Sequence, residues 1–289
     1  MNIGDIVDNR FQIVSFIDDG GTASVYKAYD LVRRRDVALK VMLKNNVDKD
    51  ACIDSFASEA SFLASLRHIN IVQIYGLGQY ENRPYIAYEL MKSPSLGDLL
   101  YKQGSFSYKE AYQIMIQILE GLKYIHGFNM IHCDIKPQNI FYGIDGVVKI
   151  SDFGIAMFSS SSLEKQKIHG SIPYLAPEVI QGKCPSYQSD IYALGVTFYE
   201  LLTNSLPFNG DTFESIAYAH LKSPFPSLIK YCPTLSEEVE NIIFKACSKN
   251  PLDRFASIEE FINALKSVKN PYKKKKISFW KKLFLRREK

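Results

Sequence analysis

Residues 11–43 alternate apolar and polar positions and are rich in β-branched and aromatic side chains. This period of two predicts three antiparallel strands, interrupted by Gly20 and Gly21. Residues 50–67 instead repeat apolar side chains at helical spacing, at Phe56, Ala60, Leu63 and Leu66. Strand character returns in the segments IVQIYGLGQY and RPYIAYEL. The first third of the chain therefore predicts a five-stranded sheet with one main helix.

After the short link MKSPS the pattern becomes mainly helical. The best helical segments are residues 95–103, 107–127, 188–204, 211–221, 236–249 and 257–268. Between them, residues 128–180 are rich in Gly, Asp, Ser and Pro, as is typical of the long loops that carry binding and catalysis. We predict an α+β, two-lobed domain over residues 1–270, with a small lobe at 10–91, a mainly helical lobe at 92–270, and a tail at 271–289.

Composition narrows the class of protein. The 289 residues are 46% hydrophobic, which supports a large core and excludes a disordered chain. The five cysteines are scattered, without a CxxC pair or metal-ligand spacing, so they predict free thiols in a reducing cytoplasm. Neither a secretory signal nor an apolar run of about 18 residues occurs, so we expect the chain as given not to span a membrane.

The net charge of +4 is distributed unevenly. Residues 273–289 hold nine Lys or Arg and a single acid, Glu288, whereas acids outnumber bases in the remainder. An acidic globule with a short cationic tail differs from a uniformly basic nucleic-acid binder. Any role for positive charge therefore belongs to the tail.

Polar motifs interrupt the apolar pattern at five places. The segment DDGGTASV, residues 18–25, could bring backbone amides close to phosphates, although a plain Gly-rich hairpin is the simpler interpretation. Lys40 lies within the apolar segment VALKV, where it is either exposed or paired, and Glu59 offers a counter-charge. The other three motifs are HCDIKPQN at 132–139, DFG at 152–154 and APE at 176–178.

In this order and at these separations, the five motifs resemble those of the eukaryotic-type protein kinases, over about residues 10–268. The opening segment and SDIYALGVTFYELLTNSLPF are most similar to the bacterial membrane-anchored serine/threonine kinases, including those with extracellular PASTA repeats. The resemblance implies a two-lobed kinase fold, ATP and Mg²⁺ as cofactors, and protein Ser/Thr hydroxyls as substrates. It also points to autophosphorylation and to a homodimer through the small lobe.

The chemistry of phosphoryl transfer asks for these residue types. The γ-phosphate must be held in line with a hydroxyl and its charge neutralised. We predict that Asp134 accepts the hydroxyl proton and that Asn139 and Asp152 supply the oxygen ligands that magnesium prefers. Lys40, held by Glu59, would bind the α- and β-phosphates.

The resemblance implies further roles. Lys136 would contact the γ-phosphate, and the remaining ATP contacts would come from Ile17, Gly20, Gly21, Val25, Ala38, the Glu89 carbonyl and the Met91 amide. Tyr88 would be the gatekeeper beside the adenine. The resemblance also implies three structural contacts. These are a Glu178–Arg254 ion pair, hydrogen bonds from the catalytic-loop backbone to Asp190, and contacts of Ser171 with the base and Lys136.

Three positions depart from the family pattern. Asp18 and Ala23 replace glycines of the Gly-rich loop, which raises the alternative of a pseudokinase scaffold. Cys133 replaces an arginine, and a thiol cannot clamp a phosphorylated loop. We therefore expect activity that does not depend strongly on loop phosphorylation, although Ser159–Ser162 could be autophosphorylated; a redox role for Cys133 is the other interpretation. A small-molecule kinase is disfavoured because the APE segment resembles a protein-substrate platform.

The tail combines four consecutive lysines with apolar residues at helical spacing, Phe279, Trp280, Leu283 and Phe284. This pattern favours an anionic membrane surface, or the juxtamembrane part of a longer protein, and hence a place at the inner face of the cell membrane. A solvated disordered tail and, less well supported, a nucleic-acid contact are the alternatives.

Overall fold

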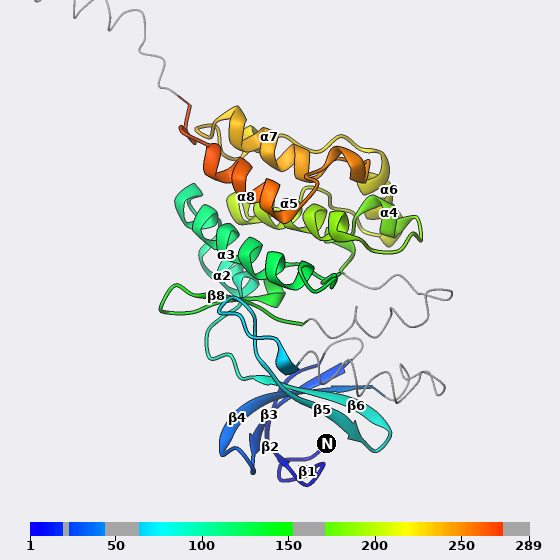
Figure 1. Ribbon diagram of the computed structural model, residues 1–289. Helices are drawn as coiled ribbons and strands as arrows, with labels where there is room; N and C mark the ends of the chain where they lie inside the picture. Colours follow the sequence, from blue (N-terminus) through cyan, green and yellow to red (C-terminus); the bar gives the residue numbers. More distant parts are fainter. Residues whose placement is uncertain (20–22, 44–63, 153–170, 274–289) are drawn as a thin grey trace, which may run out of the picture.

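The computed structural model describes residues 1–19, 23–43, 64–152 and 171–273. It forms two lobes, with the sheet of the small lobe at one end and the helices of the large lobe at the other (Figure 1). Among the described residues, no helix has both the length and the apolar character needed to cross a bilayer.

The small lobe is one antiparallel sheet of six strands in the order β1-β2-β3-β4-β6-β5. The strands are β1 (Ile6–Val7), β2 (Phe11–Asp19), β3 (Ala23–Asp30), β4 (Arg35–Met42), β5 (Ile74–Tyr80) and β6 (Arg83–Glu89). The prediction of five strands was wrong by one, because β1 has only two residues and so shows no alternation. It pairs with the start of β2, where Val7 lies opposite Phe11. The helix predicted at 50–67 falls almost entirely outside the described residues.

The two faces of the sheet have different roles. Val37, Leu39 and Val41 on β4 point into the core of the small lobe. Because side chains alternate along a strand, Ala38 and Lys40 point to the opposite face. This face turns toward the large lobe, since Tyr88, which lies opposite Ala38, belongs to the core that continues into the helices.

The helices of the large lobe confirm the predicted segments to within three residues at either end. They are α2 (Leu96–Gln103), α3 (Tyr108–His126), α5 (Tyr187–Thr203), α6 (Phe213–Lys222), α7 (Glu237–Ala246) and α8 (Ile258–Ser267). A further short helix, α4 (Pro177–Ile180), begins in the APE segment. Helix α5 is buried on nearly every side, so it forms the centre on which the other elements are positioned.

A small hairpin, β7 (Ile140–Tyr142) and β8 (Val148–Ile150), lies within the segment that was expected to be loops. Ile140 pairs with Ile150, so Asn139 and Asp152 lie at the same end of the hairpin. Two candidate metal ligands that are 13 residues apart in the sequence are thereby brought to one edge. Strands of three residues are too short to give a periodic signal, which is why the sequence did not predict them.

Candidate active site

Asp190 holds the backbone of the catalytic loop, as the sequence led us to expect. It lies in the first turn of α5, is only 1% exposed, and accepts hydrogen bonds from the amides of His132 and Cys133, each at 2.9 Å. His126 Nε2 lies 2.8 Å from the same carboxylate. Cys133 has φ = 67°, an unfavourable conformation for a residue with a side chain, and the Asp190 contact holds it there.

Asp134 follows directly and is held by contacts to both of its carboxylate oxygens. Its Oδ1 accepts from the Ser171 amide at 3.0 Å, and its Oδ2 lies 2.9 Å from Asn139 Nδ2 and 2.8 Å from Lys136 Nζ. Burial alone raises the pKa of Asp134, but the Lys136 ammonium and the Asn139 amide outweigh burial and hold it below its ordinary value. Asp134 is therefore an ionised acceptor at neutral pH.

Lys136 joins the catalytic loop to the segment before APE. Besides Asp134, its Nζ contacts Ser171 Oγ at 2.5 Å. Ser171 thus contacts the candidate base through its amide and Lys136 through its hydroxyl, which is the arrangement expected from the sequence. Residues 37 positions apart form one compact polar group.

Asn139 and Asp152 provide the candidate magnesium ligands. The Asn139 amide nitrogen donates to Asp134, at 2.8 Å to its carbonyl and 2.9 Å to Oδ2, which directs the side-chain nitrogen toward Asp134. The Asn139 backbone carbonyl accepts from the amide and hydroxyl of Ser151, next to Asp152. An amide oxygen and a carboxylate are hard ligands, so this pair fits magnesium.

Lys40 and Asp152 form an ion pair that spans the two lobes. The Lys40 side chain is 12% exposed, so the ammonium is largely buried and has the partner that burial demands. Asp152 has φ = 70°, a second strained residue in the site. The predicted partner Glu59 lies outside the described residues, so the Lys40–Glu59 pair stays a prediction.

The other predicted ATP contacts fall into four groups. Val25 and Ala38 share the sheet face of Lys40, because Val25 lies opposite Lys40 and Ala38 is two positions before it. Ile17 lies at an irregularity between β2 and β3 and is 48% exposed. Glu89 and Met91, at and just beyond the end of β6, are partly buried. Gly20 and Gly21 lie outside the described residues.

Tyr88 closes the inner end of this face. Its side chain is 6% exposed, and its hydroxyl makes no hydrogen bond within the described part of the chain. Burial and the negative charge of Asp152 raise its pKa, so the phenol stays neutral. A buried, neutral ring at this position fits the predicted gatekeeper.

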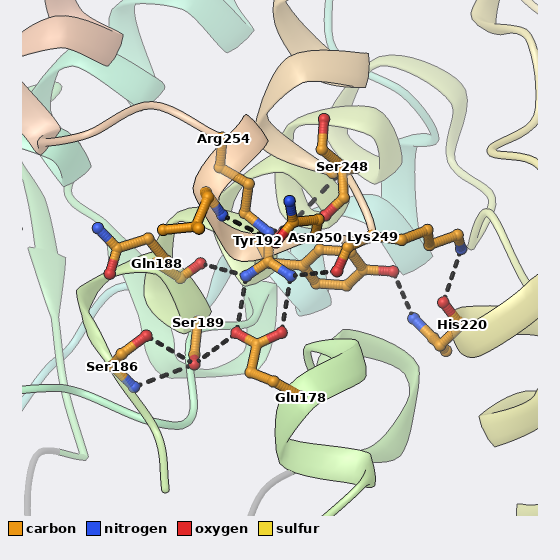
Figure 2. A network of polar contacts seen from close by, with 12 residues as sticks. Glu178, Ser186, Gln188, Ser189, Tyr192, His220, Ser248, Lys249, Asn250 and Arg254 are labelled. Carbon is orange, nitrogen blue, oxygen red and sulfur yellow. Dashed lines mark hydrogen bonds and ion pairs between the residues drawn. The ribbon is translucent and has the colours of Figure 1, made fainter. Parts of the chain in front are cut away.

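The APE segment is braced from behind by Glu178 and Arg254, as expected. The two terminal guanidinium nitrogens of Arg254 each donate to a different carboxylate oxygen of Glu178, both at 2.7 Å. Figure 2 shows that this pair is part of a larger network, in which Ser189 also donates to Glu178 and Tyr192 bonds His220. The network therefore joins α4 to α5 through Glu178 and Ser189, and α5 to α6 through Tyr192 and His220.

Sequence reasoning missed two contacts near the site. Tyr174, between Ser171 and APE, donates its hydroxyl to Glu200 of α5 at 2.6 Å. The Glu89 side chain pairs with Lys149 of β8, with the ammonium 2.7 Å from each carboxylate oxygen. Both contacts join residues that are far apart in the sequence and whose side chains have no motif, so only the fold reveals them.

A known protein family matches most of this sequence. Residues 11–269 match the model of the protein kinase domain. The chain belongs to the protein kinase domain family. The match covers strands β2 to β6, the catalytic loop and all the helices of the large lobe that the structure describes, so the kinase domain accounts for both lobes.

Several relatives of the kinase domain are bacterial. The chain is 38% identical over 270 residues to "Serine/threonine-protein kinase PrkC" of Bacillus subtilis (strain 168), covering 93% of this chain and 42% of that protein. It is 36% identical over 265 residues to "Probable serine/threonine-protein kinase PknB" of Lactococcus lactis, covering 91% and 42%. The chain therefore spans less than half the length of these relatives.

Solved structures agree on the fold. Rad53 residues 1–466 in complex with AMP-PNP superposes with a TM-score of 0.74 at 27% identity, covering 88% of this chain and 64% of that chain. The PknI kinase domain of Mycobacterium tuberculosis also gives 0.74, at 22% identity, covering 92% and 98%. The second likeness shows the fold alone.

Proposed function

We infer that this kinase domain transfers the γ-phosphoryl group of ATP to Ser or Thr hydroxyls of proteins, itself included. The observation that carries the proposal is the polar group formed by Asp134, Lys136, Asn139 and Ser171, with Asp152 at the same hairpin edge. Phosphoryl transfer relies on positioning and charge, and this group supplies an acceptor, a cation and metal ligands in one place. The bacterial relatives are named as serine/threonine kinases, which supports Ser and Thr as the acceptors.

In this mechanism Asp134 orients the substrate hydroxyl and accepts its proton. A carboxylate with a lowered pKa is a weak base, so Asp134 acts first by accepting a hydrogen bond that aims the hydroxyl oxygen at phosphorus. Because the transition state is loose, the proton needs to leave only late. Lys136 stabilises the negative charge beside the transferred phosphoryl group.

Asn139 and Asp152 would hold magnesium, which supplies positive charge to the phosphates when bound. Lys40, now paired with Asp152, would exchange that carboxylate for the α- and β-phosphates. The apolar face around Val25 and Ala38 would exclude water from the adenine. Chelation of Mg²⁺ with EDTA is expected to abolish transfer.

The proposal extends to the tail, with residues 273–289 bringing the domain to an anionic membrane surface. Support comes from the start of the tail, where the amide of Lys273 donates to the Thr234 carbonyl at 2.8 Å. Thr234 comes just before α7, which lies on the side of the large lobe away from the small lobe (Figure 1). Co-sedimentation with vesicles of anionic lipid, with and without residues 274–289, tests this, and equal binding by both chains rejects it.

The acceptor class is tested by incubating the purified chain with radiolabelled ATP, magnesium and a generic basic protein, and then identifying the labelled amino acids. We expect phosphoserine or phosphothreonine in both proteins. Label in phosphotyrosine alone, or none in protein while small hydroxyl compounds are labelled, contradicts the proposal.

A further inference from the structure

Glu89 is expected to meet adenine through its backbone carbonyl, but its side chain makes a separate contact with the large lobe. Both carboxylate oxygens lie 2.7 Å from Lys149 Nζ. The two side chains are only 23% and 27% exposed, so water shields the pair less than it shields a surface ion pair. Glu89 ends β6 and Lys149 lies in the middle of β8, so the contact joins the lobes.

A backbone frame supports this ion pair. The Gln73 amide donates to the Glu89 carboxylate at 3.2 Å, and the Gln73 carbonyl accepts from the Glu89 amide at 2.7 Å. One residue earlier, the Val72 amide donates to the Ile150 carbonyl at 2.8 Å. The segment before β5 is thus bonded to the ends of both β6 and β8. The Glu89–Lys149 pair adds a direct contact between β6 and β8, so each of the three segments is bonded to the other two.

The same strand end has a second cross-lobe contact. Asp152, three residues after Lys149, pairs with Lys40 of β4. Among the described residues, these two ion pairs join the sheet of the small lobe to β8 and the residues just after it. When Lys40 turns to the phosphates, Glu89–Lys149 is the one of these two ion pairs that remains, beside the backbone bonds of Asn70 and Val72 to Ile150.

We propose that Glu89 and Lys149 are a positioning pair that sets the affinity for ATP, by holding the adenine-contacting end of β6 at a fixed distance from Asp152. This rests on the proposed function. A site that is already ordered loses less conformational freedom on binding, so it binds more tightly. Without the pair, the backbone bonds between the segment before β5 and β8 remain, and ATP binding must restrict the freedom that the side chains no longer remove.

The test measures the dissociation constant of ATP with magnesium by calorimetry, together with KM and kcat. Lys149→Met is expected to raise the dissociation constant and KM by about three- to ten-fold, the range for a partly shielded ion pair, while kcat changes by less than about two-fold. Lys149→Arg is expected to retain affinity, because a guanidinium can bind both carboxylate oxygens. Adding Glu89→Gln to Lys149→Met should weaken binding no further, since the two act as one pair.

Two comparisons separate the outcomes. Lys123→Met breaks an exposed ion pair with Glu259 elsewhere on the large lobe and is expected to leave ATP affinity unchanged. Glu89→Gln, which keeps the size of the side chain, replaces Lys149→Met if that variant does not fold. A parent that binds and uses ATP, with variants of equal affinity, overturns this inference alone. A parent that binds no ATP overturns the proposed function as well.

Discussion

Arg254 and Glu178 form a two-bonded ion pair in the interior of the large lobe, although 76 residues separate them in the sequence. The Arg254 side chain is fully buried and that of Glu178 is 6% exposed. Arg254 also donates to the backbone carbonyls of Ser248 and Gln188, at 2.8 and 2.7 Å, so most of its donors are satisfied. Through this pair, α4 and the segment before it are fixed to the core.

Removing one partner of this pair should lower the free energy of unfolding far more than removing both partners. Arg254→Ala leaves a carboxylate buried without its cation, and we expect the free energy of unfolding to fall by about 3–5 kcal/mol. The double variant Glu178→Gln, Arg254→Met should lose clearly less. Urea unfolding of the three chains measures this, and a loss below about 1 kcal/mol for Arg254→Ala would show that the pair is not a brace.

His220 should make stability depend on pH. Burial, helped by the charge of Lys249, lowers its pKa from 6.5 to about 4. Between these values the unfolded chain binds a proton that the folded chain does not, so stability attributable to His220 is complete above about pH 6.5. It is lost as the pH falls, by up to about 1.4 kcal/mol per pH unit until about pH 4.

The control for this slope is His220→Asn, which can still bond the Tyr192 hydroxyl that now lies 2.7 Å from Nδ1 (Figure 2). The parent minus variant difference in unfolding free energy, followed by urea titration from pH 7.5 to 4.5, is expected to shrink toward acid. A difference that is independent of pH would exclude His220 as the source.

Ser171 should contribute to turnover through its hydroxyl. Ser171→Ala removes the acceptor of the 2.5 Å contact with Lys136, and we expect kcat to fall about ten-fold, as for a hydrogen bond to a charged group. Ser171→Thr keeps the hydroxyl and should keep most of kcat. Because the hydroxyl lies at the catalytic loop, KM for ATP should change little in either variant. Equal kcat for Ala and Thr variants argues against the role.

Because Cys133 stands where many kinases have an arginine, kcat should depend little on phosphorylation of the loop. The thiol is partly buried, and burial together with the negative charges of Asp190 and Asp134 raises its pKa, so this position offers neither a cation nor a reactive thiolate. Phosphatase treatment is therefore expected to change kcat by less than about three-fold, a difference below 1 kcal/mol. Abolished activity after full dephosphorylation, checked by mass spectrometry, would refute this.

The sequence predicted those parts of the fold whose signal repeats within one element. Helices α3 and α5 have 19 and 17 residues, long enough for apolar spacing to be clear, and their ends were predicted closely. Strand β1 and the β7–β8 hairpin are too short to repeat anything, so they were missed. The strands β2 to β6 lie where alternation and β-branched side chains predicted them.

The residues of the site also fall into those that the sequence predicted and those that it did not. Asp134, Lys136, Asn139 and Asp152 stand in motifs, and the fold brings the first three into contact, with Asp152 at the same hairpin edge. The partners that motifs do not mark were not predictable. Lys149 meets Glu89 only because β8 packs against the end of β6. His220 is a single histidine on an amphipathic helix, and such a histidine more often indicates core packing than a hydrogen-bond network.

An active kinase domain with Asp134 as its base must lose phosphoryl transfer, but not ATP binding, when this carboxylate is replaced by an amide. The most direct test measures phosphoryl transfer from radiolabelled ATP by the parent and by Asp134→Asn, alongside the ATP affinity of both. We expect labelled Ser or Thr with the parent, a loss of at least about a hundred-fold in the variant, and similar ATP affinity in both. A parent that binds ATP with magnesium but transfers nothing, or a variant as active as the parent, would contradict this expectation.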